Sequence, residues 1–363
     1  MIYRAIGLMS GSSLDGLDIV FIELDDSNGK WSFEIKAADC YVYDREWIER
    51  LAGAATLTAR DYFNLNALYG KYVGGLVNKF IDANNLHHRV QLIASHGHTI
   101  FHEPRNGFTT QLGDGATIAA ITGINVVSDL RALDIALGGQ GAPIVPVGEK
   151  LLFSEFDYFL NLGGIANLSF KSNDRFIAFD VCPANRILNL LAQEDNKLFD
   201  ENGMIAASGK LYTPLLTRLN ALNYYQENFP KSLANTFGTD VIFPLVQSFQ
   251  LSIPDAMRTY VEHIVQQVVY AVVKIGNVKP GAQMMVTGGG AFNIFLIKRL
   301  QEALQSLEIK VVMPGENIIK YKEALIMALI GVLRWREENT TFQSVTGASR
   351  SSIGGAVWIG QEA

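Results

Sequence analysis

The stretch from Ile6 to Asp18 constrains the fold most, because it joins two apolar runs through a short link rich in glycine and serine. The runs Tyr3–Leu8 and Leu17–Leu24 have the apolar, β-branched composition of strands. Asp15 and Gly16 supply the turn signal between them. Such a link leaves backbone N–H groups accessible, and these groups can cradle phosphate oxygens. The stretch therefore predicts a β-hairpin that either binds phosphate or is an ordinary glycine-rich turn.

Length and composition restrict the class of protein. A chain of 363 residues is too long for one compact core, so two domains are expected. The net charge of −6 argues against a nucleic-acid partner. No apolar run approaches the about 20 residues that cross a bilayer, and the N-terminus lacks the pattern of a signal peptide. Cys40 and Cys182 form neither a disulfide framework nor a metal knuckle. We expect a cytoplasmic protein with no membrane or nucleic-acid partner.

The second half of the chain repeats the opening pattern. The strand Phe156–Leu162 is followed by a glycine turn that contains Gly163 and Gly164, and by the return strand Leu168–Lys171. A strand–glycine turn–strand at the start of both halves indicates an internally duplicated architecture. The glycine-rich stretch after Ser128 is typical of a domain junction. We therefore place residues 1–128 and about 345–363 in an N-terminal lobe, and residues 129–344 in a C-terminal lobe.

A third glycine cluster follows the predicted strand Met284–Val286. It contains Gly288, Gly289 and Gly290, with Asn293 just beyond, and a helix is expected to run from there to about Leu307. Backbone donors and a helix N-terminus suit phosphate, and three glycines leave room for a flat adenine ring. A tight turn is the alternative interpretation of each cluster.

A carboxylate stands at the end of the predicted strand Phe176–Phe179. Asp180 follows this apolar run and precedes Pro183, so it can lie partly desolvated at the floor of a cleft. A carboxylate in that position can act as a general base on a hydroxyl or a water. The alternative is a helix cap or turn aspartate.

Histidines follow the predicted strand Val90–Ala94, which is expected to deliver the run Ser95–Thr99 at its C-terminal end. His96 and His98 with His102 invite a hydrolase metal site, but such a site needs further ligands. Substrate hydrogen bonding is the favoured role of His96. The metal hydrolase remains an alternative.

Together these segments resemble those of the anhydro-N-acetylmuramic acid kinase family over nearly the whole chain. The matching segments are Met9–Gly16, Ser95–Thr99, Gln111–Ala119, Val127–Pro143, Asn161–Ser169, Phe179-Asp180, Val286–Asn293 and Val345–Arg350. The resemblance implies a two-lobed actin/hexokinase-like α/β fold of the ribonuclease H type, with duplicated mixed sheets, flanking helices and an interdomain cleft. It also implies domain closure on substrate.

The implied reaction is that of a phosphotransferase in peptidoglycan recycling. Water adds to the anomeric carbon of 1,6-anhydro-N-acetylmuramic acid, the bridge opens, and O6 takes the γ-phosphoryl group of ATP to give N-acetylmuramic acid 6-phosphate. The resemblance further implies Mg²⁺, held mainly through ATP and water, and a cytoplasmic homodimer.

The family roles carry over to matching positions of this chain. Asp180 is the implied base, and Arg131 could pair with the lactyl carboxylate of the sugar. The implied sugar site comprises His96, Thr99, Asp129, Arg131 and Glu323. The implied ATP and phosphate contacts are Gly11, Ser12, Ser13, Leu14, Asp15, Gly16, Leu17, Asp18, Gly163, Gly164, Gly288, Gly289, Gly290 and Asn293.

The chain departs from the family pattern directly after the proposed base. The family usually has Thr-Gly-Pro-Gly-Asn there, whereas this chain has the run Val181–Asn185, which lacks two glycines and a hydroxyl. His98 stands where the family has glutamine. Two alternatives to the kinase follow: a paralogue that binds nucleotide or sugar without turnover, and a kinase that acts on another sugar.

Overall fold

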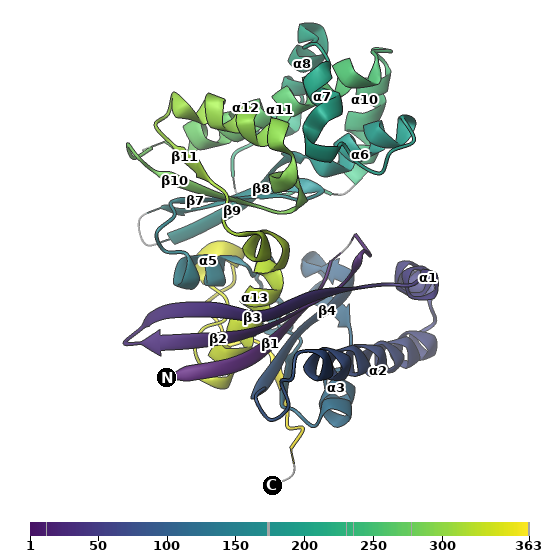
Figure 1. Cartoon of the computed structure of the whole chain (residues 1–363), viewed down its shortest axis with the longest axis vertical. Coiled ribbons are helices and arrows are strands. Elements are labelled where there is room, and N and C mark those ends of the chain that lie inside the picture. Colours follow the sequence, from purple (N-terminus) through teal and green to yellow (C-terminus); the bar gives the residue numbers. More distant parts are fainter. Residues whose placement is uncertain (12, 173–174, 230, 235, 277, 362–363) are drawn as a thin grey trace. The chain divides into compact units, whose positions relative to one another are not determined.

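The computed structural model describes residues 1–11, 13–172, 175–229, 231–234, 236–276 and 278–361. The chain forms two compact units (Figure 1). The first unit comprises Met1–Ser154 and Tyr321–Ala363, and the second comprises Glu155–Lys320.

The first unit is built on a mixed seven-stranded sheet in the order β12-β6-β4-β1-β2-β3, with β5 paired to β4. β1, β2 and β3 form an antiparallel meander, and β1 pairs in parallel with β4, as β4 does with β6. The strands are β1 Ile2–Ser10, β2 Gly16–Ser27, β3 Lys30–Val42, β4 Leu92–Glu103, β5 Phe108–Leu112, β6 Val126–Ser128 and β12 Ala356–Trp358. The opening hairpin predicted from the sequence is confirmed.

Helices cover both faces of this sheet. Ile6 and Leu8 of β1 face a core that includes Leu65 and Val73 of α2. Gly7 points to the opposite face, where a Cβ atom would lie 1.9 Å from the carbonyl oxygen of Ala324 in α13. The helices are α1 Arg45–Gly53, α2 Ala59–Ala83, α3 Gly115–Thr122, α4 Ala132–Ala136, α5 Pro146–Leu152, α13 Glu316–Trp335 and α14 Gln343–Thr346, with 3-10 turns at Ala54–Thr56 and Pro104–Asn106.

The second unit contains a mixed five-stranded sheet in the order β11-β10-β7-β8-β9. β7, β8 and β9 form an antiparallel meander, while β7 pairs in parallel with β10 and β10 with β11. The strands are β7 Tyr158–Leu162, β8 Ile165–Ser172, β9 Arg175–Pro183, β10 Gln283–Thr287 and β11 Lys310–Val312.

The long helix α11 begins after its N-cap Ser252 and presents a stripe of valine and isoleucine to the core of this unit, as its spacing predicts. The helices are α6 Asn185–Glu194, α7 Met204–Ser208, α8 Thr213–Asn220, α9 Asn223–Gln226, α10 Phe243–Gln247, α11 Ile253–Ile275 and α12 Ile294–Gln305, with short turns at Glu201–Gly203, Phe237–Ile242 and Gly289–Phe292.

The two sheets share one topology. In each, a three-stranded antiparallel meander is extended by strands that run parallel to its first strand, and helices connect the parallel strands. This repetition confirms the predicted α/β fold with duplicated mixed sheets.

The unit boundaries differ from the predicted lobe boundaries. Residues 129–154 and 321–344 belong to the first unit, although the sequence analysis placed them in the C-terminal lobe. They belong there because the carboxylate of Asp134 accepts hydrogen bonds from the Gly141 amide and from Thr346, and because α13 packs on β1. The glycine-rich stretch at 138–141 is thus a loop within the first unit.

None of the helices in the described ranges is long and apolar enough to span a membrane.

Candidate functional site

The opening hairpin of the first unit offers a short, accessible link between β1 and β2. Leu14 has a φ of +59°, and its amide donates to the Gly11 carbonyl at 3.4 Å. Ser13 and Asp15 are exposed, whereas Ser12 lies outside the described residues. A link of this kind leaves backbone N–H groups available to an anion.

Two of the predicted phosphate residues also have a packing role. A Cβ atom on Gly16 would lie 2.6 Å from the Tyr41 carbonyl oxygen of β3, so the close pairing of β2 with β3 requires glycine there. Leu17 is 2% exposed, and its side chain belongs to the core. Any contact of Leu17 with phosphate therefore has to come from its backbone.

A buried chain of hydroxyl groups holds the base of the hairpin. Tyr43 donates to Ser10 Oγ at 2.7 Å, its oxygen lies 2.5 Å from that of Tyr69, and Ser10 Oγ lies 2.9 Å from His98 Nδ1. Either Ser10 Oγ or His98 Nδ1 can be the donor of the bond between them, since the serine oxygen can accept a second hydrogen bond. Burial lowers the pKa of His98 to about 4, so this ring is neutral at pH 7. No pattern in the sequence joined these residues.

Asp18 lies in β2 opposite Cys40 of β3 and is partly buried. Burial raises the pKa of Asp18 to about 6, with smaller contributions from the charges of Glu323 and Asp15, while a hydrogen bond with Cys40 opposes the rise. The same burial and the bond to Asp18 raise the pKa of the Cys40 thiol to about 12. Asp18 is therefore a carboxyl group that resists ionisation.

Asp18→Asn is expected to stabilise the first unit at pH 7.5 by about 2 kcal/mol, because the asparagine removes a charge that folding buries at a cost. The native carboxyl binds its proton more tightly than the unfolded one, so stability falls as pH rises from about 4 to about 6 and stays lower above that range. Urea unfolding followed by tryptophan fluorescence measures the effect, and at pH 3.5 the two proteins should be equally stable. An equal difference at both pH values would contradict this account.

His96 and Arg131 form the centre of the predicted sugar site. His96 Nδ1 lies 2.9 Å from the Gly97 carbonyl, which can only accept, so Nδ1 carries the proton and Nε2 accepts from Arg131 Nε at 2.9 Å. Arg131 also donates through Nη1 to the Gly141 carbonyl at 2.6 Å. Burial, then the Arg131 charge, lowers the pKa of His96 to about 3. His96 is thus a neutral support for the guanidinium, and because both of its nitrogens are engaged it is unsuited to bind a metal.

The other residues of the predicted sugar site are Glu323, Asp129 and Thr99. Burial lowers the pKa of Arg131 to about 10, while the nearby charges of Glu323 and Asp134 act in the opposite direction. Glu323 is therefore brought close to both Arg131 and Asp18. Asp129 has a φ of +54° and accepts from Ser128 at 2.7 Å, and Thr99 pairs with Gln111 of β5.

The histidine run does not follow the end of a strand, so that prediction was wrong. β4 continues to Glu103 because β5 pairs with its second half, from His98 onward. Gly97 bends the strand with a φ of +73°. The ring of His102, at the far end of β4, contacts Thr109 at 3.3 Å.

In the second unit, Asp180 lies inside β9 and not at the end of a strand as predicted. Asn167 of β8 pairs with Asp180 and Ala166 pairs with Cys182, so Val181 is the extra residue of a β-bulge. A bulge bends a strand and redirects the neighbouring side chains, which is why such features occur beside active sites.

The Asp180 carboxylate is held by one backbone donor. The Leu233 amide donates to Oδ2 at 2.8 Å, and Oδ1 has no hydrogen bond within the part of the chain that the structure describes. Burial raises the pKa of Asp180, and the bond from Leu233 partly opposes this. One anchored oxygen, one free oxygen and a raised pKa are the properties of a general base.

The two glycine clusters of this unit lie next to each other. Gly163 and Gly164 form the turn between β7 and β8, and their carbonyls accept from the amides of Asn185 and Ala184, at the start of α6. The Asn185 side chain donates to Leu162 and lies 3.5 Å from the position of a Cβ on Gly289. Asn185 thus links the clusters.

Close packing requires glycine at positions 288 and 290. Gly288 has a φ of +81°, and a Cβ there would lie 2.4 Å from Asn161 Oδ1. The helix begins directly after Asn293, as predicted: a 3-10 turn spans Gly289–Phe292, and Asn293 caps α12 by accepting from the Leu296 amide. The N-terminus of α12 therefore already has a side-chain partner.

Comparison with known proteins places these observations in a family context. The chain matches the family model described as anhydro-N-acetylmuramic acid kinase over residues 3–360. It is 31% identical to the anhydro-N-acetylmuramic acid kinase of Sulfurovum sp. (strain NBC37-1), over 98% of this chain and 99% of that protein. It is 33% identical to that of Shewanella sediminis (strain HAW-EB3), with 97% and 98% covered. Among solved structures, the activator of the 2-hydroxyisocaproyl-CoA dehydratase from Clostridium difficile with bound ADPNP matches with a TM-score of 0.46 and 15% identity, covering 92% of this chain and 96% of that one.

Proposed function

Since the chain belongs to the anhydro-N-acetylmuramic acid kinase family, we propose that it phosphorylates 1,6-anhydro-N-acetylmuramic acid at the expense of ATP. Water adds to the anomeric carbon, the bond from that carbon to the bridging oxygen breaks, and this oxygen, O6, takes the γ-phosphoryl group. The products are N-acetylmuramic acid 6-phosphate and ADP. The observation that carries the proposal is the Asp180 carboxylate, which is held at one oxygen and has a raised pKa.

Asp180 acts in this proposal as the base that removes a proton from the attacking water. The bond from Leu233 fixes Oδ2 and leaves Oδ1 for the water. The raised pKa of the carboxyl, which burial causes, increases the basicity of the ionised form. Phosphoryl transfer itself requires mainly positioning and neutralisation of charge.

ATP is proposed to bind through its phosphates to the hairpin link, at Gly11, Ser13 and Leu14. Mg²⁺ would be held mainly by the phosphates and water, with Asp18 as the protein carboxylate. Asp18 fits this role because burial, with smaller contributions from the charges of Glu323 and Asp15, disfavours its ionisation, a cost that a divalent cation relieves. When bound, Mg²⁺ supplies neutralisation of the phosphate charge. Gly163, Gly164 and the run Gly288–Gly290 remain proposed nucleotide contacts through their backbones.

Arg131 is proposed to bind the lactyl carboxylate of the sugar, because two other sides of its guanidinium are already fixed by His96 and Gly141. Arg131→Gln is expected to raise KM for the anhydro sugar about 50-fold, by loss of a charge-assisted hydrogen bond. With 1,6-anhydro-N-acetylglucosamine, which lacks the lactyl group, the same variant should change KM only slightly. Steady-state kinetics with both sugars provides the test, and equal losses on both would argue against the pairing.

A coupled assay of ADP release, with and without the anhydro sugar, tests the proposed function directly. We expect sugar-dependent ADP formation together with a phosphorylated, ring-opened product identified by mass spectrometry and NMR. ATP binding without turnover would favour the binding paralogue, for which the run Val181–Asn185 is the motivation. Faster turnover with glucose or N-acetylglucosamine would favour another sugar kinase.

We further propose a cytoplasmic homodimer. ATP is available in the cytoplasm, and Cys40 and Cys182 are both free thiols, as expected in a reducing compartment. Light scattering that gives the mass of a single chain would overturn the dimer.

A further inference from the structure

Residues 224–229 and 231–233, hereafter the clasp segment, contact Asp180 at three points. The Tyr224 hydroxyl donates to the Asp180 carbonyl at 2.6 Å, and the Asp180 amide donates to the Lys231 carbonyl at 3.1 Å. The third contact is the bond from the Leu233 amide to the carboxylate, at 2.8 Å. The amide, carbonyl and carboxylate of one residue are therefore all engaged by one short segment.

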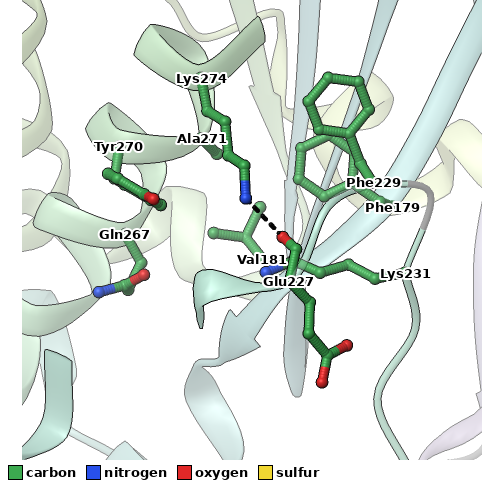
Figure 2. A pocket seen from close by; sticks show the side chains of 9 residues that line it. All are labelled: Phe179, Val181, Glu227, Phe229, Lys231, Gln267, Tyr270, Ala271 and Lys274. Carbon is green, nitrogen blue, oxygen red and sulfur yellow. Dashed lines mark hydrogen bonds between the residues drawn. The ribbon is translucent and has the colours of Figure 1, made fainter. Parts of the chain in front are cut away.

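The clasp segment is itself fixed at several places. Lys231 Nζ donates to the Tyr224 carbonyl at 2.7 Å and lies 4.2 Å from the centre of the Tyr224 ring, which closes the segment on itself. Lys274 of α11 donates to the carbonyl of Glu227 at 2.7 Å (Figure 2). Phe229 stacks on Phe179 of β9, with 5.1 Å between ring centres. The contacts to Asp180 thus rest on anchors to both α11 and the sheet.

The clasp segment lies beside the strand that contains Asp180, and this strand needs additional hydrogen-bond partners. β9 is the edge strand of its sheet, and the bulge at Val181 interrupts its pairing beside Asp180. An edge strand lacks a neighbour on one side, so its backbone groups need another partner. The pocket between the clasp segment and α11 has a volume of only about 10 Å³, room for about one water molecule (Figure 2). The segment is therefore packed down on β9 and does not enclose a ligand.

We propose that the clasp segment positions Asp180 for proton abstraction, with Tyr224 and Lys231 as positioning residues. This inference rests on the proposed function, in which Asp180 is the base. Tyr224 fixes the backbone of the base, Lys231 fixes Tyr224, and the Leu233 amide sets the rotamer of the carboxylate. None of these three groups needs to touch the substrate.

Tyr224→Phe tests the positioning role, because it removes one hydroxyl and keeps the ring that faces Lys231. We expect kcat to fall about tenfold while KM for ATP and for the sugar changes less than twofold, since the loss concerns the reacting geometry. Tyr225→Phe is the matched control: its hydroxyl contacts His263 at 3.0 Å, away from Asp180. The control should lower the melting temperature and leave kcat unchanged. Equal kcat values for the two variants would overturn the inference.

Leu233→Pro and Leu233→Ala test the amide contact without relying on turnover. Proline removes the N–H that stabilises the ionised carboxylate, whereas alanine keeps it, so the pKa of Asp180 should rise in the proline variant relative to the alanine variant. ¹³C NMR of labelled aspartate carboxyls measures this pKa, and the acid limb of kcat/KM should move to higher pH in parallel. Identical Asp180 pKa values in the two variants would overturn the inference.

The two proposals can fail separately. Absence of product from the wild-type protein would refute the proposed function. The NMR comparison would still show whether the Leu233 amide stabilises the ionised Asp180 carboxylate. If the Asp180→Asn variant were inactive and the Tyr224→Phe variant fully active, the positioning role of the clasp segment would be refuted. The proposed function would stand.

Discussion

Asp180→Asn is expected to lower kcat about 10³-fold while leaving ATP binding intact. An amide of the same shape can still accept the hydrogen bond from Leu233, but it cannot take a proton from water. The size of the effect is that expected for loss of a general base. The coupled assay measures kcat, and calorimetric titration with ATP measures binding.

The same variant should be at least as stable as the wild type at pH 7.5. Burial raises the pKa of Asp180, so folding disfavours its ionised form, and the neutral asparagine removes that cost. The gain should disappear as the pH falls below the pKa of the unfolded aspartate, because both side chains are then neutral. Asp240→Asn, at an exposed position of the same unit, is the control. An inactive variant that is also much less stable would indicate a structural role for Asp180 in place of the catalytic one.

The sequence predicted the parts of the fold that depend on local pattern. The opening hairpin and the duplicated strand–turn–strand plan both follow from glycine turns and apolar strand runs. The resemblance to a family selected Asp180, which spacing alone could not separate from a turn aspartate.

The misplaced features depend on pairing between distant segments. β4 and β9 extend beyond their predicted apolar runs because β5 pairs with the second half of β4 and β8 pairs with β9 as far as Pro183. A local sequence pattern does not reveal such distant partners. The lobe boundary shifts for the same reason, since α13 is fixed to β1 by a contact between Gly7 and Ala324. Tyr224 was missed because no pattern relates a tyrosine to a carbonyl that lies 44 residues away.

Lys322→Met is expected to destabilise the first unit by about 3 kcal/mol. Lys322 Nζ of α13 lies 2.9 Å from Glu149 Oε1 of α5, and both side chains are only 4% exposed. Removing the cation takes the positive charge at 2.9 Å away from a buried carboxylate, which is far more costly than loss of an exposed pair. The four tryptophans, at positions 31, 47, 335 and 358, all belong to the first unit, so their fluorescence during urea unfolding reports on this unit.

A double variant separates the loss of stability caused by removing Lys322 alone from the stability that the Lys322–Glu149 pair contributes. Replacing Glu149 with leucine in the Lys322→Met background should restore most of the stability, because two apolar side chains of similar size can fill the same volume without burying charge. Arg45→Met, which removes an exposed pair with Glu49 on α1, should change stability by less than about 0.5 kcal/mol. If the double variant were as unstable as the single one, the pair would be needed for its geometry between α5 and α13. Recovery would show instead that the buried ions contribute little net stability, and that the single variant is costly because one charge remains.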